Sequence, residues 1–586
     1  GANPRAMALP VLTFFPRPRE LTLRGGWLKV PPLPHPTASF IESLPTTIAE
    51  ARAALAGAAD GACRIVHQPE CGAEGYHLEI LSSGIRLNAG DAHGVLYGAQ
   101  TLRQIAAQYP DELPHLVIID SPDLPVRGFM LDCSRTRVPT QAALLDLVCA
   151  LGRLRVNQLQ LYIEHTFAFR GHEDAWKDAS PLTPAEIREL DDACAAVGIE
   201  LVPNLNTFGH MERWLRHTRY RAMAECPEGW IHPLTGQFKE FPGTLRPDQA
   251  SVDFAGALLD DYLPNFRSHQ VNIGGDEPWE LGQGFSKQAV AERGKHRVYL
   301  DHLKKLCALG RDRGRTVQFW GDILLEDLAL AQDAPADTVP VVWGYDAGHP
   351  FKEQCGRLRE LGRAYLVAPG TSAWQSFTGR LDNALTNQAE AVGAAVRHEA
   401  RGILLTTWGD NGHHQPWPTA WLPMAAGLAQ AWGFAANAKT DFAAGCALLG
   451  NLSAAEGQVV AAALTQLGTL DGQIAKANRN KSLTWDFLTA KPDALAKFTD
   501  GVSAPEITAS QAHLTEAEAL VAKIANETIR EELSLGARLA GAGLRRASGR
   551  PIAAEEQASL KKEYESVWLR RSRPGGLSES VAGLFG

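Results

Sequence analysis

The hydrophobic pattern along the chain changes character twice. In the first part it predicts four strands, at 21–30, 64–67, 77–81 and 84–87. The segment 92–108 repeats apolar residues at helical spacing, with Val95, Leu96, Ala99, Leu102 and Ile105 on one face. We therefore expect residues 1–122 to form a small α/β domain that supports the rest of the chain.

A different pattern occupies residues 123–435. Eight short apolar runs of strand type recur there, at 127–131, 158–163, 199–204, 270–273, 316–319, 339–342, 364–367 and 402–406. Helices are predicted between them at 140–154, 184–197, 286–311 and 386–401. Runs rich in Val, Ile and Leu without alternation are typical of strands buried on both faces of a parallel sheet. Eight such units predict an α/β fold of the (β/α)8 TIM-barrel type, with a doubly wound open sheet as the alternative.

The third pattern is helical. From residue 436 the chain is rich in Ala, Leu, Glu and Lys, and helices are predicted at 442–449, 454–467, 509–547 and 553–568. We expect residues 436–586 to form a C-terminal helical domain that packs on the barrel or forms a homodimer.

Composition narrows the class of protein. A chain of 586 residues is too long for one hydrophobic core, which agrees with several domains. A net charge of −9 argues against a nucleic-acid or anionic-membrane partner, and no apolar run reaches the ~20 residues of a membrane span. Nine scattered cysteines without a CxxC pair favour reduced thiols and a cytoplasmic location. Residues 1–6 precede Met7 and are interpreted as an expression remnant, and 8–15 lacks the features of a signal peptide.

Polar and aromatic residues follow the predicted barrel strands. Because function in a TIM barrel gathers at the carboxyl ends of the strands, these residues are expected to share one site. They are Asp132, Arg135, Glu164, His165, Asn206, His210, Asp276, Glu277, Trp320, Asp322, Trp343, Tyr345, Trp374, Trp408 and Asp410. Aromatic rings stack on the apolar face of a pyranose, and charged groups bind its hydroxyls. This combination is typical of a sugar pocket.

Asp276 and Glu277 are adjacent carboxylates at the end of a predicted strand. Neighbours in a regular strand face opposite sides, so both reach one ligand only if the chain turns. Gly274 and Gly275 permit such a turn. Two carboxylates this close repel unless their surroundings separate their pKa values. A solvated acidic turn or a Mg²⁺ site is the alternative.

Four segments resemble glycoside hydrolase family 20, the β-N-acetylhexosaminidases. They are RGFMLDCSR at 127–135, NLNTFGH at 204–210, GGDE at 274–277 and TWGD at 407–410. They follow the family's order on predicted strands one, three, four and eight, and GVLYGAQTL at 94–102 is similar to the end of the family's accessory domain. The resemblance spans the barrel and the N-terminal domain, and the C-terminal region lies outside it. It implies an exo-acting, retaining enzyme without metal or cofactor that removes terminal β-GlcNAc or β-GalNAc.

The resemblance also implies roles for the acidic pair. Glu277 corresponds to the general acid/base, and Asp276 to the carboxylate that accepts the N–H of the substrate's 2-acetamido group. The acetamido oxygen is then the nucleophile and closes an oxazolinium intermediate. A second enzyme carboxylate ~5 Å away, as in ordinary retaining glycosidases, is therefore unnecessary.

Further roles follow from position in the family's motifs. Arg135 corresponds to the arginine that binds the 3- and 4-hydroxyls, although a salt bridge with Asp132 or Asp276 is the structural alternative. Asp410 stands where the family more often has Glu. His210 corresponds to a histidine that orients the acid, and Glu164–His165 departs from the family's Asp-Asp pair. Trp320, Trp343 and Trp408 correspond to the aromatic walls, with core packing as the alternative. The acetamido oxygen is assigned to either Tyr345 or Trp374, with Asn383 as a further candidate.

Two other functions compete with this hypothesis. A metal-dependent hydrolase on the same barrel would use His165, His210, Asp276 and the pair His413–His414, and it would need these ligands to converge. A non-catalytic glycan-binding protein would keep Arg135 and the tryptophans but would not need Glu277. The preference for GlcNAc or GalNAc and the natural aglycone stay open.

Overall fold

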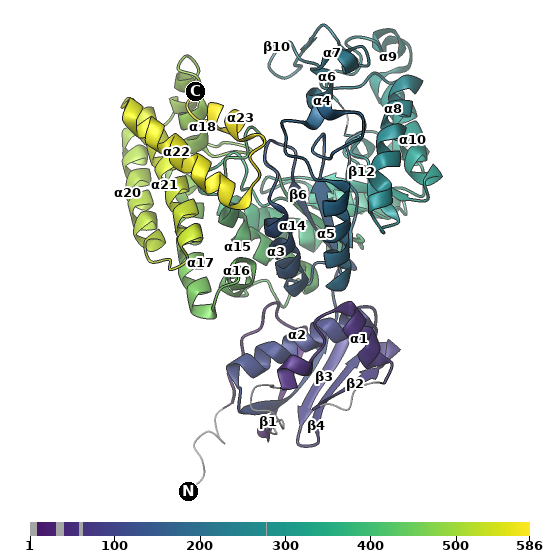
Figure 1. Cartoon of the computed structure of the whole chain (residues 1–586), viewed down its shortest axis with the longest axis vertical. Coiled ribbons are helices and arrows are strands. Elements are labelled where there is room, and N and C mark those ends of the chain that lie inside the picture. The colour runs from purple at the N-terminus through teal and green to yellow at the C-terminus, as the bar shows by residue number, and fades with distance from the viewer. Residues whose placement is uncertain (1–8, 31–39, 58–61, 277) are drawn as a thin grey trace.

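The computed structural model describes residues 9–30, 40–57, 62–276 and 278–586 (Figure 1). Glu277 therefore lies outside the described residues. A parallel barrel occupies the centre of the molecule, the α/β domain lies beneath it, and the C-terminal helices pack on one flank (Figure 1).

The N-terminal domain is a five-stranded sheet with two helices. Its strand order is β1-β5-β3-β4-β2, formed by β1 (Glu20–Lys29), β2 (Cys63–His67), β3 (Tyr76–Leu81), β4 (Gly84–Ala89) and β5 (Glu112–Asp120). Helices α1 (Ile48–Leu55) and α2 (Ala92–Gln108) contact the sheet. The four predicted strands and the predicted helix are confirmed. Strand β5 was missed because Pro114 and His115 interrupt its apolar run.

Two buried ion pairs join this domain to the barrel. Arg155 contacts Asp120 at 3.2 Å with both side chains 1% exposed, and fully buried Arg127 contacts Glu74 at 2.9 Å. The Asp120 carboxylate also accepts hydrogen bonds from the Tyr76 hydroxyl and the Trp432 indole. Breaking one member of a buried pair typically costs ~3–5 kcal/mol. These contacts therefore fix the N-terminal domain against the barrel.

The eight predicted barrel strands are all present and parallel. They are β6 (Val126–Asp132), β7 (Gln158–Tyr162), β8 (Glu200–Leu201), β11 (Gln270–Asn272), β12 (Thr316–Trp320), β13 (Val339–Trp343), β14 (Leu366–Ala368) and β15 (Gly402–Thr407). The sheet order is β11-β12-β13-β14-β15-β6-β7-β8. A parallel bridge between Asn204 and Asn272 joins its two edges. The sheet is thus a closed TIM barrel with a small N-terminal α/β domain and a C-terminal helical region.

Part of the barrel interior is polar, although the strands themselves are rich in Val, Ile and Leu. The side-chain amide of Gln160 donates to Gln318 at 2.8 Å, and its carbonyl accepts from Asn204 at 3.0 Å and from Asn272 at 3.2 Å. Gln318 in turn donates to Gln158 at 3.2 Å. Buried amides are tolerated here because they hydrogen-bond one another.

The outer helices follow the expected β–α alternation. The main ones are α3 (Gln141–Arg153), α5 (Pro184–Ala196), α8 (Gln249–Tyr262), α10 (Lys295–Asp312), α13 (Phe351–Glu360), α14 (Leu381–Arg397) and α15 (Trp421–Trp432). The single helix predicted at 286–311 is wrong. Gly294, at φ 86°, separates α9 (Lys287–Arg293) from α10, because that left-handed conformation ends a helix.

Loops after the strands carry short elements near the site. These are α4 (Glu173–Trp176), α6 (Glu212–Leu215), α7 (Thr218–Arg221), α11 (Ile323–Glu326), α12 (Leu328–Asp333) and a small hairpin of β9 (Trp230–Ile231) and β10 (Phe238–Lys239). Figure 1 shows α4, α6, α7 and β10 at the end of the barrel that faces away from the N-terminal domain.

The C-terminal region is helical as predicted, with different boundaries. It contains α16 (Ala443–Gly450), α17 (Ala454–Gly468), α18 (Leu483–Thr489), α19 (Leu495–Thr499), α20 (Ala504–Val521), α21 (Glu527–Ala547), α22 (Ala554–Arg571) and α23 (Leu577–Ala582). The one helix predicted at 509–547 is two, because Asn526 caps the start of α21. In the described part of the chain no single helix has the length and apolarity to cross a membrane. Ala443–Gly450 and Ala454–Gln473 meet those criteria only as a pair bent by 109°.

Candidate active site

A cavity of about 410 Å³ opens at the carboxyl ends of the barrel strands. Nine of the residues predicted from sequence line it together: Arg135, His210, Asp276, Trp320, Trp343, Tyr345, Trp374, Trp408 and Asp410. Residues from seven different loops or strand ends thus meet in one place. Tyr162, Trp279, Asp346, His349 and Asn480 also line the cavity and were missed. Of these, Trp279 lies only two residues beyond Glu277, so its position after the GGDE motif was an available signal.

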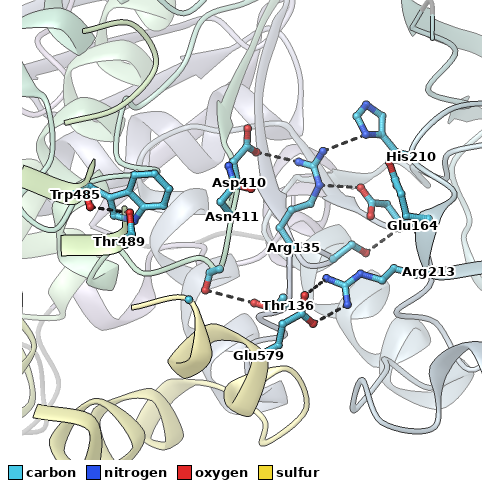
Figure 2. Close-up of a pocket in the computed structure, with 14 residues that line it drawn as sticks. Arg135, Thr136, Glu164, His210, Arg213, Asp410, Asn411, Trp485, Thr489 and Glu579 are labelled. Carbon is cyan, nitrogen blue, oxygen red and sulfur yellow. Dashed lines mark hydrogen bonds and ion pairs between the residues drawn. The ribbon is translucent and has the colours of Figure 1, made fainter. Parts of the chain in front are cut away.

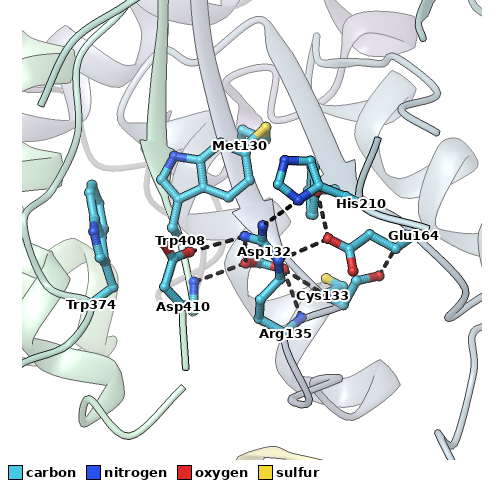
Figure 3. Close-up of polar contacts among 12 residues, drawn as sticks. Met130, Asp132, Cys133, Arg135, Glu164, His210, Trp374, Trp408 and Asp410 are labelled. Carbon is cyan, nitrogen blue, oxygen red and sulfur yellow. Dashed lines mark hydrogen bonds and ion pairs between the residues drawn. The ribbon is translucent and has the colours of Figure 1, made fainter. Parts of the chain in front are cut away.

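Arg135 is held by three carboxylates (Figure 3). Its guanidinium contacts Asp132 at 3.2 Å, Glu164 at 2.8 Å and Asp410 at 3.0 Å. Asp132 also accepts the backbone N–H groups of Ser134 and Arg135, which turns the chain after β6. Burial raises the pKa of both Asp132 and Asp410, although the nearby Arg135 charge opposes the rise. The salt bridge expected as the alternative is therefore present with Asp132, and the guanidinium still borders the cavity.

Asp276 and His210 form an ion pair in the lining of the cavity. His210 Nε2 lies 3.0 Å from Asp276 Oδ2. Burial disfavours the charged imidazole, but the Asp276 carboxylate outweighs it and raises the pKa of His210 to about 9. Burial likewise favours protonated Asp276, but the charge and hydrogen bond of His210 lower its pKa below the ordinary value. Asp276 therefore favours the protonated imidazole, whereas the Arg135 guanidinium, 3.3 Å from His210 Nδ1, opposes it.

The backbone around this pair is unusual. Gly274 and Gly275 have φ of 73° and 81°, as expected from the need for a turn before Asp276. A Cβ on Gly274 would lie 2.1 Å from Asn206 Oδ1, so only glycine fits there. His210 itself has φ 56°, a conformation that non-glycine residues rarely adopt. Such strain is concentrated at functional sites, where the surrounding structure holds it in place.

Aromatic rings form a wall beside Arg135, whose guanidinium carbon lies 5.3 Å from the centroid of the Trp408 ring. Trp320 and Trp408 meet with ring centroids 5.8 Å apart, and Trp343 stacks on Tyr345 at 5.5 Å. Trp343 is 36% exposed and lies at the rim, whereas Trp320 is buried. An aromatic wall beside a fixed guanidinium can bind a pyranose by its apolar face and by its hydroxyls.

Trp374 and Tyr345 were both candidates for the acetamido oxygen. The Trp374 indole N–H donates to Asn480 Oδ1 at 2.8 Å, and its ring packs edge-on against Tyr345 at 5.3 Å. Asn383 does not line the cavity; its side-chain amide donates to the Tyr345 main-chain oxygen at 2.8 Å. The indole N–H is thus engaged, while Asn383 fixes the backbone of Tyr345. No sequence pattern pointed to Asn480, because it belongs to the C-terminal region.

Other residues predicted for the site do not line this cavity. Asn206 donates to the Tyr162 hydroxyl, and that hydroxyl donates to Glu164, both at 2.6 Å. Glu164 therefore supports Arg135 rather than His210. His165 is buried, which lowers its pKa well below the ordinary value. Asp322, just before α11, does not line the cavity either.

The histidines proposed for a metal site do not converge. His414 is held between the Ser580 carbonyl at 2.8 Å and the Trp485 indole at 3.0 Å, both from the C-terminal region. Over the residues described, no three His, Cys, Asp or Glu side chains are placed to share a metal ion. His413 and His414 thus lie where the barrel meets the C-terminal helices.

Comparison with known proteins agrees with this geometry. The profile of glycosyl hydrolase family 20, domain 2, matches residues 15–121, and that of the family 20 catalytic domain matches residues 125–378. A β-hexosaminidase of Akkermansia muciniphila is 27% identical over 281 residues, which cover 43% of this chain and 56% of the relative. Human hexosaminidase D is 26% identical over 299 residues, covering 47% of this chain and 59% of the relative. The matches thus span just over half the length of these relatives.

A solved structure extends the likeness to the fold of almost the whole chain. The chitobiase of Flavobacterium johnsoniae superposes with a TM-score of 0.59 at 17% identity, over 95% of this chain and 99% of that one. At that identity the likeness concerns the fold alone. The two family profiles together match more than half of the 586 residues. With its motifs gathered around one cavity of the barrel, this chain belongs to glycoside hydrolase family 20.

Proposed function

We propose that this protein is an exo-acting, retaining β-N-acetylhexosaminidase that releases terminal non-reducing β-GlcNAc or β-GalNAc. The observation that carries the proposal is the ionised Asp276, paired with His210 in an aromatic-walled cavity that Arg135 also borders. Family membership and the names of the two relatives, a β-hexosaminidase and hexosaminidase D, support it.

Asp276 and Glu277 have different roles in the reaction. When the acetamido oxygen attacks C1, the amide nitrogen gains positive charge, and the Asp276 carboxylate accepts its N–H and balances that charge. Glu277, the next residue in the chain, gives a proton to the leaving glycosidic oxygen. It then takes a proton from the water that reopens the oxazolinium ring at C1. Two displacements at C1 leave the β configuration unchanged.

Residues of the cavity wall provide the contacts that bind the terminal sugar. Arg135 presents donors to the ring hydroxyls in an orientation that its three carboxylate partners fix. Trp320, Trp343 and Trp408 enclose the sugar face and the acetamido methyl group. Tyr345 is assigned to the acetamido oxygen, because the N–H of Trp374 already has Asn480 as acceptor.

The deciding test is hydrolysis of 4-nitrophenyl β-GlcNAc, β-GalNAc and β-glucoside side by side. We expect the plain glucoside to react at least ~10²-fold more slowly, because it lacks the internal nucleophile. NMR of the first product should show the β anomer, and a chelator should leave the rate unchanged. A comparable rate on the glucoside, or an α anomer as the first product, would refute the proposal.

Replacing His210 should change the pH dependence. His210→Asn removes the positive charge that keeps the pKa of Asp276 low. Burial then raises that pKa, and the acid limb of kcat/KM moves to higher pH.

The same pair makes the stability of the wild type depend on pH. The contribution of His210 to stability is complete below its ordinary pKa of 6.5 and is lost as pH rises through about 9. The contribution of Asp276 to stability is present above pH 3.8, its ordinary pKa, and is lost as pH falls through its lowered pKa.

The measurement is kcat/KM on 4-nitrophenyl β-GlcNAc across the acidic range. Exposed His269, changed to Asn, is the matched control and should leave the profile unchanged. An acid limb that His210→Asn does not move would show that Asp276 does not depend on His210 for its ionisation.

A further inference from the structure

A cavity of about 270 Å³ lies where the barrel meets the C-terminal helices. Its lining comes mainly from the first turn of α14, the end of α17, the segment 470–478 and the start of α18. It shares no lining residue with the active-site cavity. Its size is close to the lower end of the ~300–1,000 Å³ range of small-molecule sites. It is therefore a space of its own, apart from the one assigned to the terminal sugar.

Arg380 lines this cavity with hydrogen-bond donors that the protein leaves largely unused. Its side chain is only 9% exposed. The guanidinium lies 3.8 Å from Asp346, 4.0 Å from Asp471 and 3.5 Å from the main-chain oxygen of Asn478. Charge-assisted N–H···O⁻ hydrogen bonds are normally ~2.7–2.9 Å long. The buried guanidinium is therefore incompletely paired, and a carboxylate bound in the cavity would complete its hydrogen bonding.

Two further features of the lining favour a carboxylate. Arg380 is the N-cap residue of α14, and as a pure donor it cannot cap the first N–H groups of that helix. Those N–H groups have no partner within a helix, and they attract negative charge. Thr484 in α18 is 2% exposed, and no described residue hydrogen-bonds its hydroxyl. One carboxylate could therefore accept from the guanidinium, the helix terminus and this hydroxyl.

The other cations of the lining are already engaged. The Lys481 ammonium pairs with Asp486 at 2.8 Å. The Lys476 ammonium donates to three main-chain oxygens at and after the end of α19, at 2.6, 3.0 and 3.2 Å. Of the cationic groups in the described lining, Arg380 is thus the one with donors left for a ligand.

Asp471 supplies the opposite charge beside Arg380. Its carboxylate accepts a hydrogen bond from the Ser482 hydroxyl at 2.8 Å, but burial still raises its pKa to about 6. An ammonium group next to it would favour the ionised form. An α-amino acid carries its carboxylate and its ammonium on the same carbon, which matches a guanidinium and a carboxylate that lie 4.0 Å apart.

A monosaccharide is the alternative occupant, because hydroxyls also bind a guanidinium and a carboxylate. Sugar sites typically stack an aromatic ring on the pyranose. No aromatic residue is among the described residues that line this cavity, whereas Leu470, Ile474 and Leu483 are. Such a lining suits the apolar side chain of a small amino acid better than a sugar ring.

The cavity is connected to the wall assigned to the acetamido group. Asn383, in its lining, donates to the Tyr345 main-chain oxygen at 2.8 Å and accepts the N–H of Ala347 at 2.9 Å. Asn480, in the same segment as much of the lining, accepts the Trp374 indole N–H at 2.8 Å. A molecule in this cavity therefore lies next to residues that position Tyr345 and Trp374.

Helix α18 gives a second connection. Thr484 lines this cavity, and the next residue, Trp485, lines a space beside Arg135 and Asp410 (Figure 2). The Trp485 indole N–H also donates to His414 Nδ1 at 3.0 Å, in the loop after β15. A ligand that binds α14 and α18 therefore contacts two segments that extend to the active site.

We propose that this cavity binds a small apolar α-amino acid, with its carboxylate at Arg380 and its ammonium at Asp471, and that the bound molecule holds Tyr345 and Trp374 in position. The binding is independent of the proposed function, whereas the effect on catalysis rests on it. Saturation with the amino acid should lower KM for 4-nitrophenyl β-GlcNAc at least ~5-fold, the lower end of coupling between distinct sites. It should change kcat less than ~2-fold, because the ligand touches no reacting group.

Isothermal titration calorimetry of the full chain tests the class of ligand. The ligands are L-leucine, N-acetyl-L-leucine, which lacks the ammonium charge, L-leucinamide, which lacks the carboxylate, and D-glucose as the sugar. We expect L-leucine to bind at least ~10-fold more tightly than either derivative, since each loses one charged contact. Glucose should not bind.

Two variants link the binding to this cavity. Thr484→Val keeps the shape of the side chain and removes a hydroxyl without a described partner, so the fold should be retained while L-leucine binds at least ~5-fold more weakly. Asp471→Asn removes the charge beside the ammonium and should weaken binding at least ~10-fold. Thr515→Val is the matched control, because its hydroxyl donates to the Gln511 main-chain oxygen within α20, outside the cavity.

The outcomes separate this inference from the proposed function. The inference is overturned if L-leucine does not bind, or if a derivative or glucose binds as tightly. Binding that both cavity variants leave unchanged overturns the site. Binding without an effect on KM overturns the connection to the acetamido wall. If the wild type does not hydrolyse the substrate at all, the proposed function fails, while the calorimetry still decides whether the cavity binds the amino acid.

Discussion

Asp276→Asn should lower kcat on 4-nitrophenyl β-GlcNAc by ~10²–10³, the loss typical of removing one electrostatic stabiliser of a transition state. The wild-type carboxylate is kept ionised by His210 at 3.0 Å against the effect of burial. An amide of the same shape cannot balance the positive charge that forms on the acetamido nitrogen. It also removes the carboxylate that His210 contacts. KM should change much less than kcat, because the missing interaction is strongest in the transition state.

The matched control is Asp260→Asn, an acid-to-amide change at an exposed position paired with Arg313. It should keep the wild-type rate. Circular dichroism and thermal unfolding of both variants separate a chemical effect from loss of folding. A folded Asp276→Asn variant with nearly wild-type kcat would contradict participation of the acetamido group.

Glu277→Gln should lower the rate by at least ~10², the lower end for loss of general acid–base catalysis. This expectation rests on the sequence motif and on the position of Asp276 beside it, since Glu277 lies outside the described residues. The loss should depend on the leaving group. A 2,4-dinitrophenyl glycoside has an acidic phenol that departs without a proton, so the variant should be impaired least on it.

The measurement is kcat/KM of wild type and variant on a series of aryl β-GlcNAc substrates with phenols of different pKa. A steeper dependence on phenol pKa in the variant identifies Glu277 as the acid. If the variant lost the same factor on every substrate, or lost nothing, another residue would have to supply the proton.

Much of the barrel could be predicted from the sequence, because the patterns that indicate strands depend on neighbouring residues. An apolar run such as 402–406 specifies a strand through its own residues, and the eight runs occur in the order in which the strands pair. The two glycines before Asp276 likewise indicate a turn, because both adopt the positive φ angles that favour glycine. Helix ends were less accurate, because Gly294 and Asn526 interrupt patterns that otherwise continue. The cytoplasmic location and the homodimer stay predictions.

By itself the sequence determined the eight barrel strands, the adjacent carboxylates after the fourth strand and the aromatic residues at the strand ends. Only the tertiary structure decided which side chains meet. Asp410 contacts Arg135 across 275 residues, and Asn480 reaches Trp374 from the C-terminal helices. Periodicity and motif spacing report local backbone conformation, whereas such contacts depend on how the barrel closes and on how distant segments pack against it.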